Sequence, residues 1–448
     1  NVIPAQEVKG PSGRLTAQSQ HAAEVTEEFS PVSVRYFSDG VQLVEFPKNI
    51  SGWVRLAIRG AKKGDVVSVC YDERVNRDFT PVAPSPGNAK DLRKPVDGPD
   101  RRRIDCYFDA SASTNVCTVD TGFQTDRIIC SGADVEMYEP RFTYNGFQYV
   151  VIRGLREPLK MEDIKARFVH TAFPRQAKFE CSDPLFNRLM DMTDVAYRSN
   201  YTDGFPTDCP HREKNGWMGD ASFACELAQY TYENTSGYEK WLRDIRDAQN
   251  EKGDLPGIVP TAGWGFKWGN GPAWDCVLVY LPYFTYLWRG DATMAAESVE
   301  AFMAYLKYLR TRVDEKGLLH IGLGDWCHTE VKRPQAPLAV TDTIVSMDIA
   351  NKMAVLLEAV GKTAEAEYAR SQAGLYREAI RAHLVDFDTM LVEGECQTSQ
   401  AMALYYGVFN EDEKQAAFEQ LLALIAECGD FGLGGSIAPL ISLCSMIV

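Results

Sequence analysis

Residues 203–220 read DGFPTDCPHREKNGWMGD and gather ionisable side chains beside an indole. Asp208, Glu213 and Asp220 lie five and seven residues apart. Two prolines deny the segment a regular helix and its glycines keep the backbone flexible, so the three carboxyls can converge on one pocket. Carboxylates in one cleft repel each other, and at least one is therefore expected to hold its proton near neutral pH.

A protonated carboxyl beside ionised ones suits cleavage of a glycosidic bond, in which one acid protonates the leaving oxygen and one base activates water. Arg212 can pair with a sugar hydroxyl or a neighbouring carboxylate, and Trp217 offers an apolar face to a sugar ring. The alternative is a capped helix entrance in which the charges are solvated and Asp220 faces water.

Two later stretches, GWGFKWGNGPAWDC and GLGDWCH, repeat the combination of tryptophan, aspartate and glycine. The side chains that they supply are Trp264, Trp268, Trp274, Asp275, Asp325 and Trp326. Aromatic rings interleaved with carboxylates suit a carbohydrate, because the rings meet its apolar faces and the carboxylates accept from its hydroxyls. Tryptophans of a core would instead be expected among aliphatic residues. The pattern favours a sugar-binding site.

Metal and nucleophile chemistry find little support in the spacing. His320 and His328 lie eight residues apart, without the i, i+4 spacing of a metalloprotease helix. The 12 cysteines include no CxxC pair, and their disulfide state is left open. Cys209 and His211 could form a nucleophile pair, but no third partner is identifiable. We predict neither a metal nor a cofactor.

The net charge of −15 argues against nucleic acid or an acidic membrane surface as a partner. A basic cluster at residues 90–103 is rich in Pro, Gly and Asp and is interpreted as a solvated loop. No apolar run is long enough to span a membrane. The sequence begins without Met or an apolar leader segment. We expect a secreted or periplasmic location rather than a cytoplasmic one.

Three regions with different residue patterns predict the elements that would position these side chains. Residues 1–30 are polar and are expected to form a tail or linker. Residues 31–173 contain short alternating runs such as QLVEF and WVRLAIRG, which predict an antiparallel β-sandwich. Residues 174–448 contain long segments of 3.6-residue period, about nine or ten helices joined by loops rich in Gly, Pro and Trp. We expect an all-α toroid whose loops carry the site.

Two segments show the helical signals most clearly. Residues 341–361 place apolar side chains on one stripe and end at Gly361, a typical helix stop. Residues 291–310 repeat the pattern, with Asp291 positioned to cap the helix.

The stretch TDCPHREKNGWMGDAS closely resembles the signature of family 78 glycoside hydrolases, the α-L-rhamnosidases, which reads D-C-P-x-R-(D/E)-(E/K)-x-x-G-W-x-G-D. The matching positions are Asp208, Cys209, Pro210, Arg212, Glu213, Gly216, Trp217, Gly219 and Asp220. Residues 121–155 resemble the end of the family's β-sandwich domain. GLGDW and residues 397–409 are similar to later barrel segments, so the resemblance covers about residues 35–430.

The resemblance implies a β-sandwich followed by an (α/α)6 barrel that hydrolyses terminal α-L-rhamnosides with inversion and without a catalytic metal. It assigns Glu213 as general acid, with Asp208 and Asp220 holding sugar hydroxyls. Arg212 and Trp217 are implied to line the same pocket. Further substrate contacts are expected from Trp268, Asp275 and Trp326. Rhamnose-containing glycosides or polysaccharides are the implied partners.

In one respect the sequence departs from the family pattern. The resemblance implies a general base, a Glu in a late W-E-R-W-like segment, and this chain contains no such segment. The chain ends in an apolar run at residues 432–448, which we interpret as a truncated or altered C-terminus of an incomplete barrel. We therefore expect this form to be catalytically impaired.

Two other readings stay open at this point. One is a different inverting (α/α)6 glycosidase, or a phosphorylase of similar architecture. The other is a non-catalytic carbohydrate-binding protein. Activity on a panel of aryl glycosides, with and without phosphate, distinguishes a rhamnosidase from another glycosidase or a phosphorylase. Sugar binding without hydrolysis would indicate a carbohydrate-binding protein.

Overall fold

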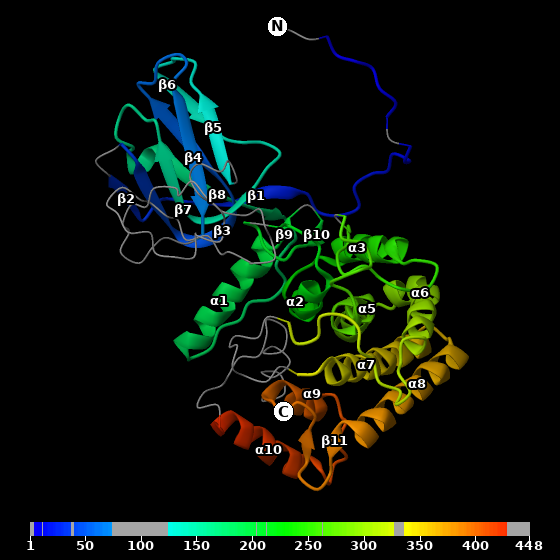
Figure 1. Cartoon of the computed structure of the whole chain (residues 1–448). Coiled ribbons are helices and arrows are strands. Elements are labelled where there is room, and N and C mark those ends of the chain that lie inside the picture. The colour runs from blue at the N-terminus through cyan, green and yellow to red at the C-terminus, as the bar shows by residue number, and fades with distance from the viewer. Residues whose placement is uncertain are drawn as a thin grey trace.

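The computed structural model describes residues 4–10, 12–36, 40–73, 124–202, 204–211, 213–261, 263–326 and 336–427. Three predictions lie outside these residues: the solvated basic loop at residues 90–103, the apolar run at residues 432–448, and any role of Arg212 or His328. Within the described residues an N-terminal antiparallel sheet domain precedes a domain of helices (Figure 1).

Eight described strands form one antiparallel sheet in the order β1-β8-β3-β7-β4-β5, and β2 and β6 each pair with β3. The strands are β1 (Ala23–Phe29), β2 (Ser33–Tyr36), β3 (Gln42–Arg59), β4 (Val66–Asp72), β5 (Thr125–Ile129), β6 (Val135–Tyr138), β7 (Asn145–Arg153) and β8 (Ile164–Thr171). The expectation of a tail over residues 1–30 is wrong for residues 23–29. They form the edge strand β1, which pairs with β8 from Ala23↔Thr171 to Phe29↔Ala166.

Strand β3 unites what the sequence predicts as two strands, QLVEF and WVRLAIRG, into one bent element. Its first half pairs with β2, its second half pairs with β8 and β6, and β7 pairs with it from Gln42 to Gly52. Pro47, which has no N–H to donate, lies where the register with β7 shifts. Gly52 has φ 145°, and a Cβ there would lie 1.9 Å from the Arg167 carbonyl oxygen, so only glycine lets β8 approach. The described strands form this single bent sheet, and the sandwich stays a prediction.

The helical domain contains ten α-helices within the described residues, in line with the nine or ten that the sequence predicts. They are α1 (Pro184–Ser199), α2 (Met218–Thr231), α3 (Thr235–Ala248), α4 (Pro272–Asp275), α5 (Val277–Arg289), α6 (Thr293–Arg310), α7 (Leu338–Ala359), α8 (Thr363–His383), α9 (Gln397–Tyr405) and α10 (Lys414–Glu427). Two predicted signals are present. Gly361 ends α7 with φ 74°, and Asp291 Oδ1 accepts the Thr293 N–H at 2.8 Å at the start of α6.

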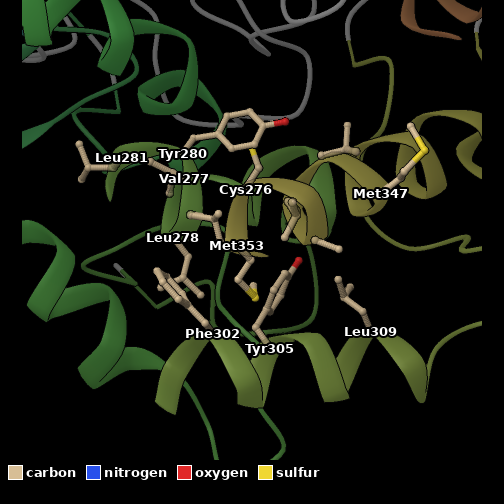
Figure 2. Close-up of a cluster of buried hydrophobic side chains, with 14 of the residues drawn as sticks. Cys276, Val277, Leu278, Tyr280, Leu281, Phe302, Tyr305, Leu309, Met347 and Met353 are labelled. Carbon is tan, nitrogen blue, oxygen red and sulfur yellow. The ribbon is translucent and has the colours of Figure 1, made fainter. Parts of the chain in front are cut away.

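Contacts between the helices separate an inner from an outer layer. Helices α2, α5, α7 and α9 contact one another in sequence, while α3, α6, α8 and α10 pack outside them. The burial of side chains supports this division into layers. Helix α7 is buried on every side from Ala339 to Met347, whereas α8 buries only one stripe. The predicted single stripe therefore describes only the second half of α7. Figure 2 shows part of the core between α5, α6 and α7, where Leu278, Phe302 and Met353 meet.

The connections alternate in length. The inner helices α2, α5 and α7 each join the next outer helix through a three-residue turn, at residues 232–234, 290–292 and 360–362. The connections back to an inner helix are long, and they include residues 200–217, 249–271 and 311–337. Because the two helices of each hairpin run antiparallel, the long connections between hairpins lie at the same end of the domain. The stretches singled out in the sequence lie in these loops.

Candidate active site

The signature stretch enters α2 through a closed loop, residues 208–211 and 213–217, here called the acid loop. It follows a two-residue hairpin of β9 (Tyr201–Thr202) and β10 (Phe205–Pro206). Two hydrogen bonds close its base: the Asp208 N–H donates to the Asn215 carbonyl at 3.0 Å, and the Asn215 N–H donates to Asp208 Oδ1 at 2.9 Å. The non-helical backbone that Pro206 and Pro210 predict is present at residues 208–211 and 213–216.

The two glycines at the α2 entrance serve close packing, in contrast to the flexibility expected from the sequence. Neither Gly216 nor Gly219 has a positive φ. A Cβ on Gly216 would lie 2.0 Å from the Val259 carbonyl oxygen, and a Cβ on Gly219 would lie 2.7 Å from the Trp274 indole. Any larger residue at these two positions would push α2 away from the neighbouring loop.

The Cys209 thiol joins two of the three carboxyl-bearing residues. Its Sγ donates to Asp208 Oδ2 at 2.9 Å and accepts the Glu213 backbone N–H at 3.4 Å. The buried His211 imidazole instead lies 3.3 Å from Glu73 Oε2 through its Nδ1. These contacts give Cys209 a structural role, and they do not support the Cys–His nucleophile pair.

The Glu213 carboxyl is oriented by a neighbour within the loop. Its Oε2 accepts the Trp217 indole N–H at 2.9 Å and the Asn215 side-chain amide at 3.5 Å. The side chain is half-buried. Because the Trp217 indole N–H is hydrogen-bonded to Oε2, the Glu213 carboxyl is held beside Trp217.

The other two carboxyls have raised pKa values. Burial, followed by the negative charge of Glu213, raises the pKa of Asp208 to about 6 against the effect of its hydrogen bonds. Burial, then the charges of Asp208 and Glu213, raises the pKa of Asp220 to about 7. The Asp220 residue as a whole is nevertheless exposed. The expectation of a carboxyl that holds its proton near neutral pH agrees with Asp220.

Four indoles form a connected surface beside these carboxyls, here called the tryptophan wall: Trp217, Trp264, Trp268 and Trp326. Ring centroids lie 5.6 Å apart for Trp217 and Trp268, 5.2 Å for Trp264 and Trp268, and 5.5 Å for Trp268 and Trp326. Trp264 and Trp268 expose 42% and 37% of their surface, which leaves ring faces open to a ligand. Trp274 is buried beneath them with Trp217.

Two buried carboxyls hold the loops that carry the wall. The loops cross where Gly271 meets Gly322, because a Cβ on Gly271 would lie 2.7 Å from the Gly322 Cα. On one side of the crossing, Asp275 Oδ2 accepts the Gly271 N–H at 3.0 Å. On the other side, Asp342 Oδ2 accepts the Ile321 N–H at 2.6 Å.

The expected substrate contact from Asp275 is wrong. This side chain has no accessible surface, and its Oδ2 also accepts the Tyr305 hydroxyl at 3.0 Å. Burial raises the pKa of Asp275 well above its ordinary range and favours the protonated form. Asp275 therefore supports the wall from behind. Asp325 is also buried, and its Oδ2 accepts the Ala336 N–H at 3.2 Å.

Sequence reasoning missed Asp342, although a signal was present. Asp342 is a lone acid within the otherwise apolar and small-residue stretch LAVTDTIVSM at the start of α7. A carboxyl buried all round on a helix needs a donor, and the Ile321 backbone N–H provides it.

Metal and redox chemistry gain no support from the described ranges. Among the described residues, no three or more His, Cys, Asp or Glu side chains are grouped so as to hold a metal ion. His320 Nε2 lies 2.9 Å from Asp314 Oδ2 at the surface. The seven cysteines of the described part of the chain are all free thiols. No helix within it is long and apolar enough to cross a membrane.

Comparison with known families decides which glycosidase scaffold this is. The family model of the bacterial alpha-L-rhamnosidase 6 hairpin glycosidase domain matches residues 174–435. The model of the bacterial alpha-L-rhamnosidase concanavalin-like domain matches residues 35–170. The chain belongs to the bacterial α-L-rhamnosidase family. In this rhamnosidase-family chain the hairpin match includes the acid loop and the tryptophan wall.

Named relatives are longer than this rhamnosidase-family chain. An alpha-L-rhamnosidase of Formosa agariphila is 29% identical over 418 residues, which are 89% of this chain and 40% of that protein. One of Streptomyces avermitilis is 29% identical over 416 residues, covering 92% of this chain and 36% of that protein. The chain thus spans about two fifths of the length of these relatives.

Solved rhamnosidase structures share the fold. The alpha-L-rhamnosidase from Dictyoglumus thermophilum matches with a TM-score of 0.81 at 26% identity, covering 95% of this chain and 45% of that one. The Streptomyces avermitilis enzyme, solved in complex with L-rhamnose, matches with a TM-score of 0.80 at 27% identity, covering 96% and 38%.

Proposed function

We propose that this protein hydrolyses terminal α-L-rhamnosides with inversion, with Glu213 as the general acid. One observation carries the proposal: the Glu213 carboxyl, fixed by the Trp217 indole, lies among two further carboxyls beside the tryptophan wall. The family match and a relative solved with L-rhamnose support the sugar. We further propose that the helix hairpins form part of an (α/α)6 barrel and that the sheet belongs to a β-sandwich.

In the proposed reaction the ring of a rhamnoside lies against the exposed faces of Trp264 and Trp268. Asp208 and Asp220 accept hydrogen bonds from its hydroxyls, and a protonated Asp220 can also donate one. Glu213 gives its proton to the glycosidic oxygen as the bond from that oxygen to the anomeric carbon breaks. Water attacks the opposite face and loses its proton to a base, which requires about 6.5–9.5 Å between acid and base carboxyls.

No residue of this chain is assigned as the base. Rhamnose-containing glycosides or polysaccharides are the proposed substrates. The proposed location is secreted or periplasmic.

An aryl α-L-rhamnoside tests the function, with proton NMR to follow the anomer released. We expect the β-anomer of rhamnose to appear first, and we expect Glu213→Gln to slow its release about 10²- to 10⁴-fold. Matched aryl β-D-glucosides and α-L-fucosides serve as controls, with and without phosphate. Faster cleavage of a control sugar, or α-rhamnose as the first product, would contradict the proposal.

A further inference from the structure

The tip of the acid loop contacts the sheet domain. The residues that meet there lie far apart in the sequence. A Cβ on Gly146, in β7, would lie 2.7 Å from the His211 backbone nitrogen and 2.9 Å from a Pro210 ring carbon. Gln124 occupies both backbone groups of Gly146, accepting its N–H at 2.8 Å and donating to its carbonyl at 3.1 Å. Gly146 thus offers the loop a close contact at a point of the sheet where the backbone N–H and carbonyl are already hydrogen-bonded.

A second contact joins the same two parts of the molecule. The buried His211 imidazole lies 3.3 Å from a carboxyl oxygen of Glu73, which follows β4. Glu73, Gln124 and Gly146 come from the ends of β4, β5 and β7, which are neighbours in the sheet. One end of the sheet domain therefore forms the seat of the acid loop.

Lys214 makes the third contact, and it is the neighbour of the proposed acid. Its Nζ donates to the Tyr144 carbonyl at 2.5 Å and lies 4.4 Å from the centre of the Tyr144 ring. A hydrogen bond and a cation–π contact together bind the ammonium from two sides. Burial lowers the pKa of Lys214, consistent with an ammonium enclosed at the domain junction.

The backbone at Lys214 shows that this contact constrains the loop. Lys214 has φ 55°, a left-handed conformation that residues with a Cβ adopt at an energetic cost. Such a conformation persists where the surroundings hold it. The Lys214 side chain reaches back to Tyr144 while the preceding side chain, Glu213, reaches forward to Trp217. The direction of the acid is therefore coupled to the attachment of the lysine.

We propose that Lys214 is a positioning residue that aims the Glu213 carboxyl by fastening the acid loop to Tyr144 of the sheet domain. The sheet domain is then a working part of the active site. The proposal deepens the proposed function and rests on Glu213 acting as the acid. Its first consequence, however, concerns the hydrogen bond between Glu213 and Trp217, which can be measured without turnover.

The indole proton of Trp217 reports that hydrogen bond in the full 448-residue chain labelled with ¹⁵N-tryptophan. In Lys214→Met we expect its hydrogen exchange to accelerate about tenfold, which corresponds to about 1.4 kcal/mol of lost protection. The Trp241 indole, which donates to the Val259 carbonyl at 2.9 Å in the core, should exchange at an unchanged rate. Lys240→Met, which removes a lysine paired with Asp244 on α3, is the matched control and should change neither rate.

Lys214→Gly keeps the test decisive if the methionine variant fails to fold, because glycine accepts φ 55° while removing the same side chain. It should accelerate Trp217 exchange as the methionine variant does. Unchanged Trp217 exchange in a folded Lys214 variant would overturn the proposal, and so would equal acceleration at Trp241.

Kinetics with two leaving groups separate this proposal from the proposed function. A misplaced general acid harms a poor leaving group, which needs the proton, far more than an activated one. We expect kcat of Lys214→Met to fall about 10- to 100-fold on methyl α-L-rhamnoside and to change little on the 2,4-dinitrophenyl rhamnoside. Equal losses on both would overturn positioning. A wild-type chain inactive on both would count against the proposed function alone and leave the indole measurement to decide.

Discussion

The acid loop meets the loops that carry the other three indoles of the tryptophan wall at Trp217, yet the two regions are held by different interactions. The acid loop is fastened from outside, through a lysine and a close backbone contact with the sheet domain. The loops of the wall are fastened from within, through carboxyls that have almost no accessible surface. The group proposed to move a proton thus depends on a domain junction, and the surface proposed to bind the ring depends on the helical core.

This difference matters because the two kinds of fastening respond to different changes. A junction of a few polar contacts can be weakened without unfolding either domain. A buried carboxyl that satisfies backbone donors cannot be lost without leaving those donors unpaired, which destabilises the whole domain. The following predictions separate the two regions, starting with the largest expected effect.

Glu213→Gln should remove the chemistry and leave the wall intact. We expect kcat on an aryl rhamnoside to fall by about 10² to 10⁴, because an amide cannot deliver the proton. The indole can still donate to the amide oxygen, so L-rhamnose affinity should hold. Steady-state kinetics and calorimetric titration measure the two quantities. A parallel loss of affinity would place Glu213 in binding instead.

Asp275→Leu should damage the wall through stability. The change leaves the Gly271 N–H and the Tyr305 hydroxyl without their acceptor, at about 1–3 kcal/mol of unfolding free energy for each group. Asp275→Asn should cost much less, since the raised pKa already favours a neutral group and the amide oxygen still accepts. Urea unfolding of both variants makes the comparison, and equal losses would contradict it.

Trp268→Ala should weaken sugar binding with little effect on folding. Removing this half-exposed ring is expected to lower L-rhamnose affinity about 3- to 10-fold, or about 0.5–1.5 kcal/mol. Trp288→Ala removes an exposed indole outside the wall and is the matched control. Calorimetry that finds the same affinity for both variants would show that the wall does not contact the sugar.

Asp220→Asn should change how stability depends on pH. The folded-state pKa of Asp220 is about 7, above the ordinary value of 3.8, so the folded protein binds the proton more tightly than the unfolded chain. The resulting stabilisation is complete below about pH 4 and is lost as pH rises through 7. Wild type should therefore lose stability relative to Asp220→Asn between about pH 4 and 7 in urea titrations. A gain in wild-type stability over that pH range would mean that folding lowers the pKa of Asp220.

The sequence predicts the parts of this molecule whose causes are local. Alternation and 3.6-residue periodicity indicate strands followed by helices, and Gly361 and Asp291 mark helix ends as expected. The carboxyls of the signature stretch and the tryptophans of two loops do come together. Their roles come from a family resemblance, which periodicity alone could not provide.

The sequence-based predictions fail where contacts between distant residues determine the structure. Residues 23–29 appear too polar for a core strand, yet β8 provides an edge on which they pair. Asp275 has the composition of a sugar ligand, and only the packing of α6 against it shows that no sugar can reach it. The partnership of Lys214 with Tyr144 joins residues 70 positions apart, so no local pattern could indicate it.

Titration of L-rhamnose into this chain, followed by tryptophan fluorescence, tests the central claim most directly, because binding does not require the base. We predict a saturable change with L-rhamnose that is absent with D-glucose and lost in Trp217→Ala. No saturable response to L-rhamnose, or the same response in Trp217→Ala, would contradict a rhamnoside site formed by the acid loop and the tryptophan wall.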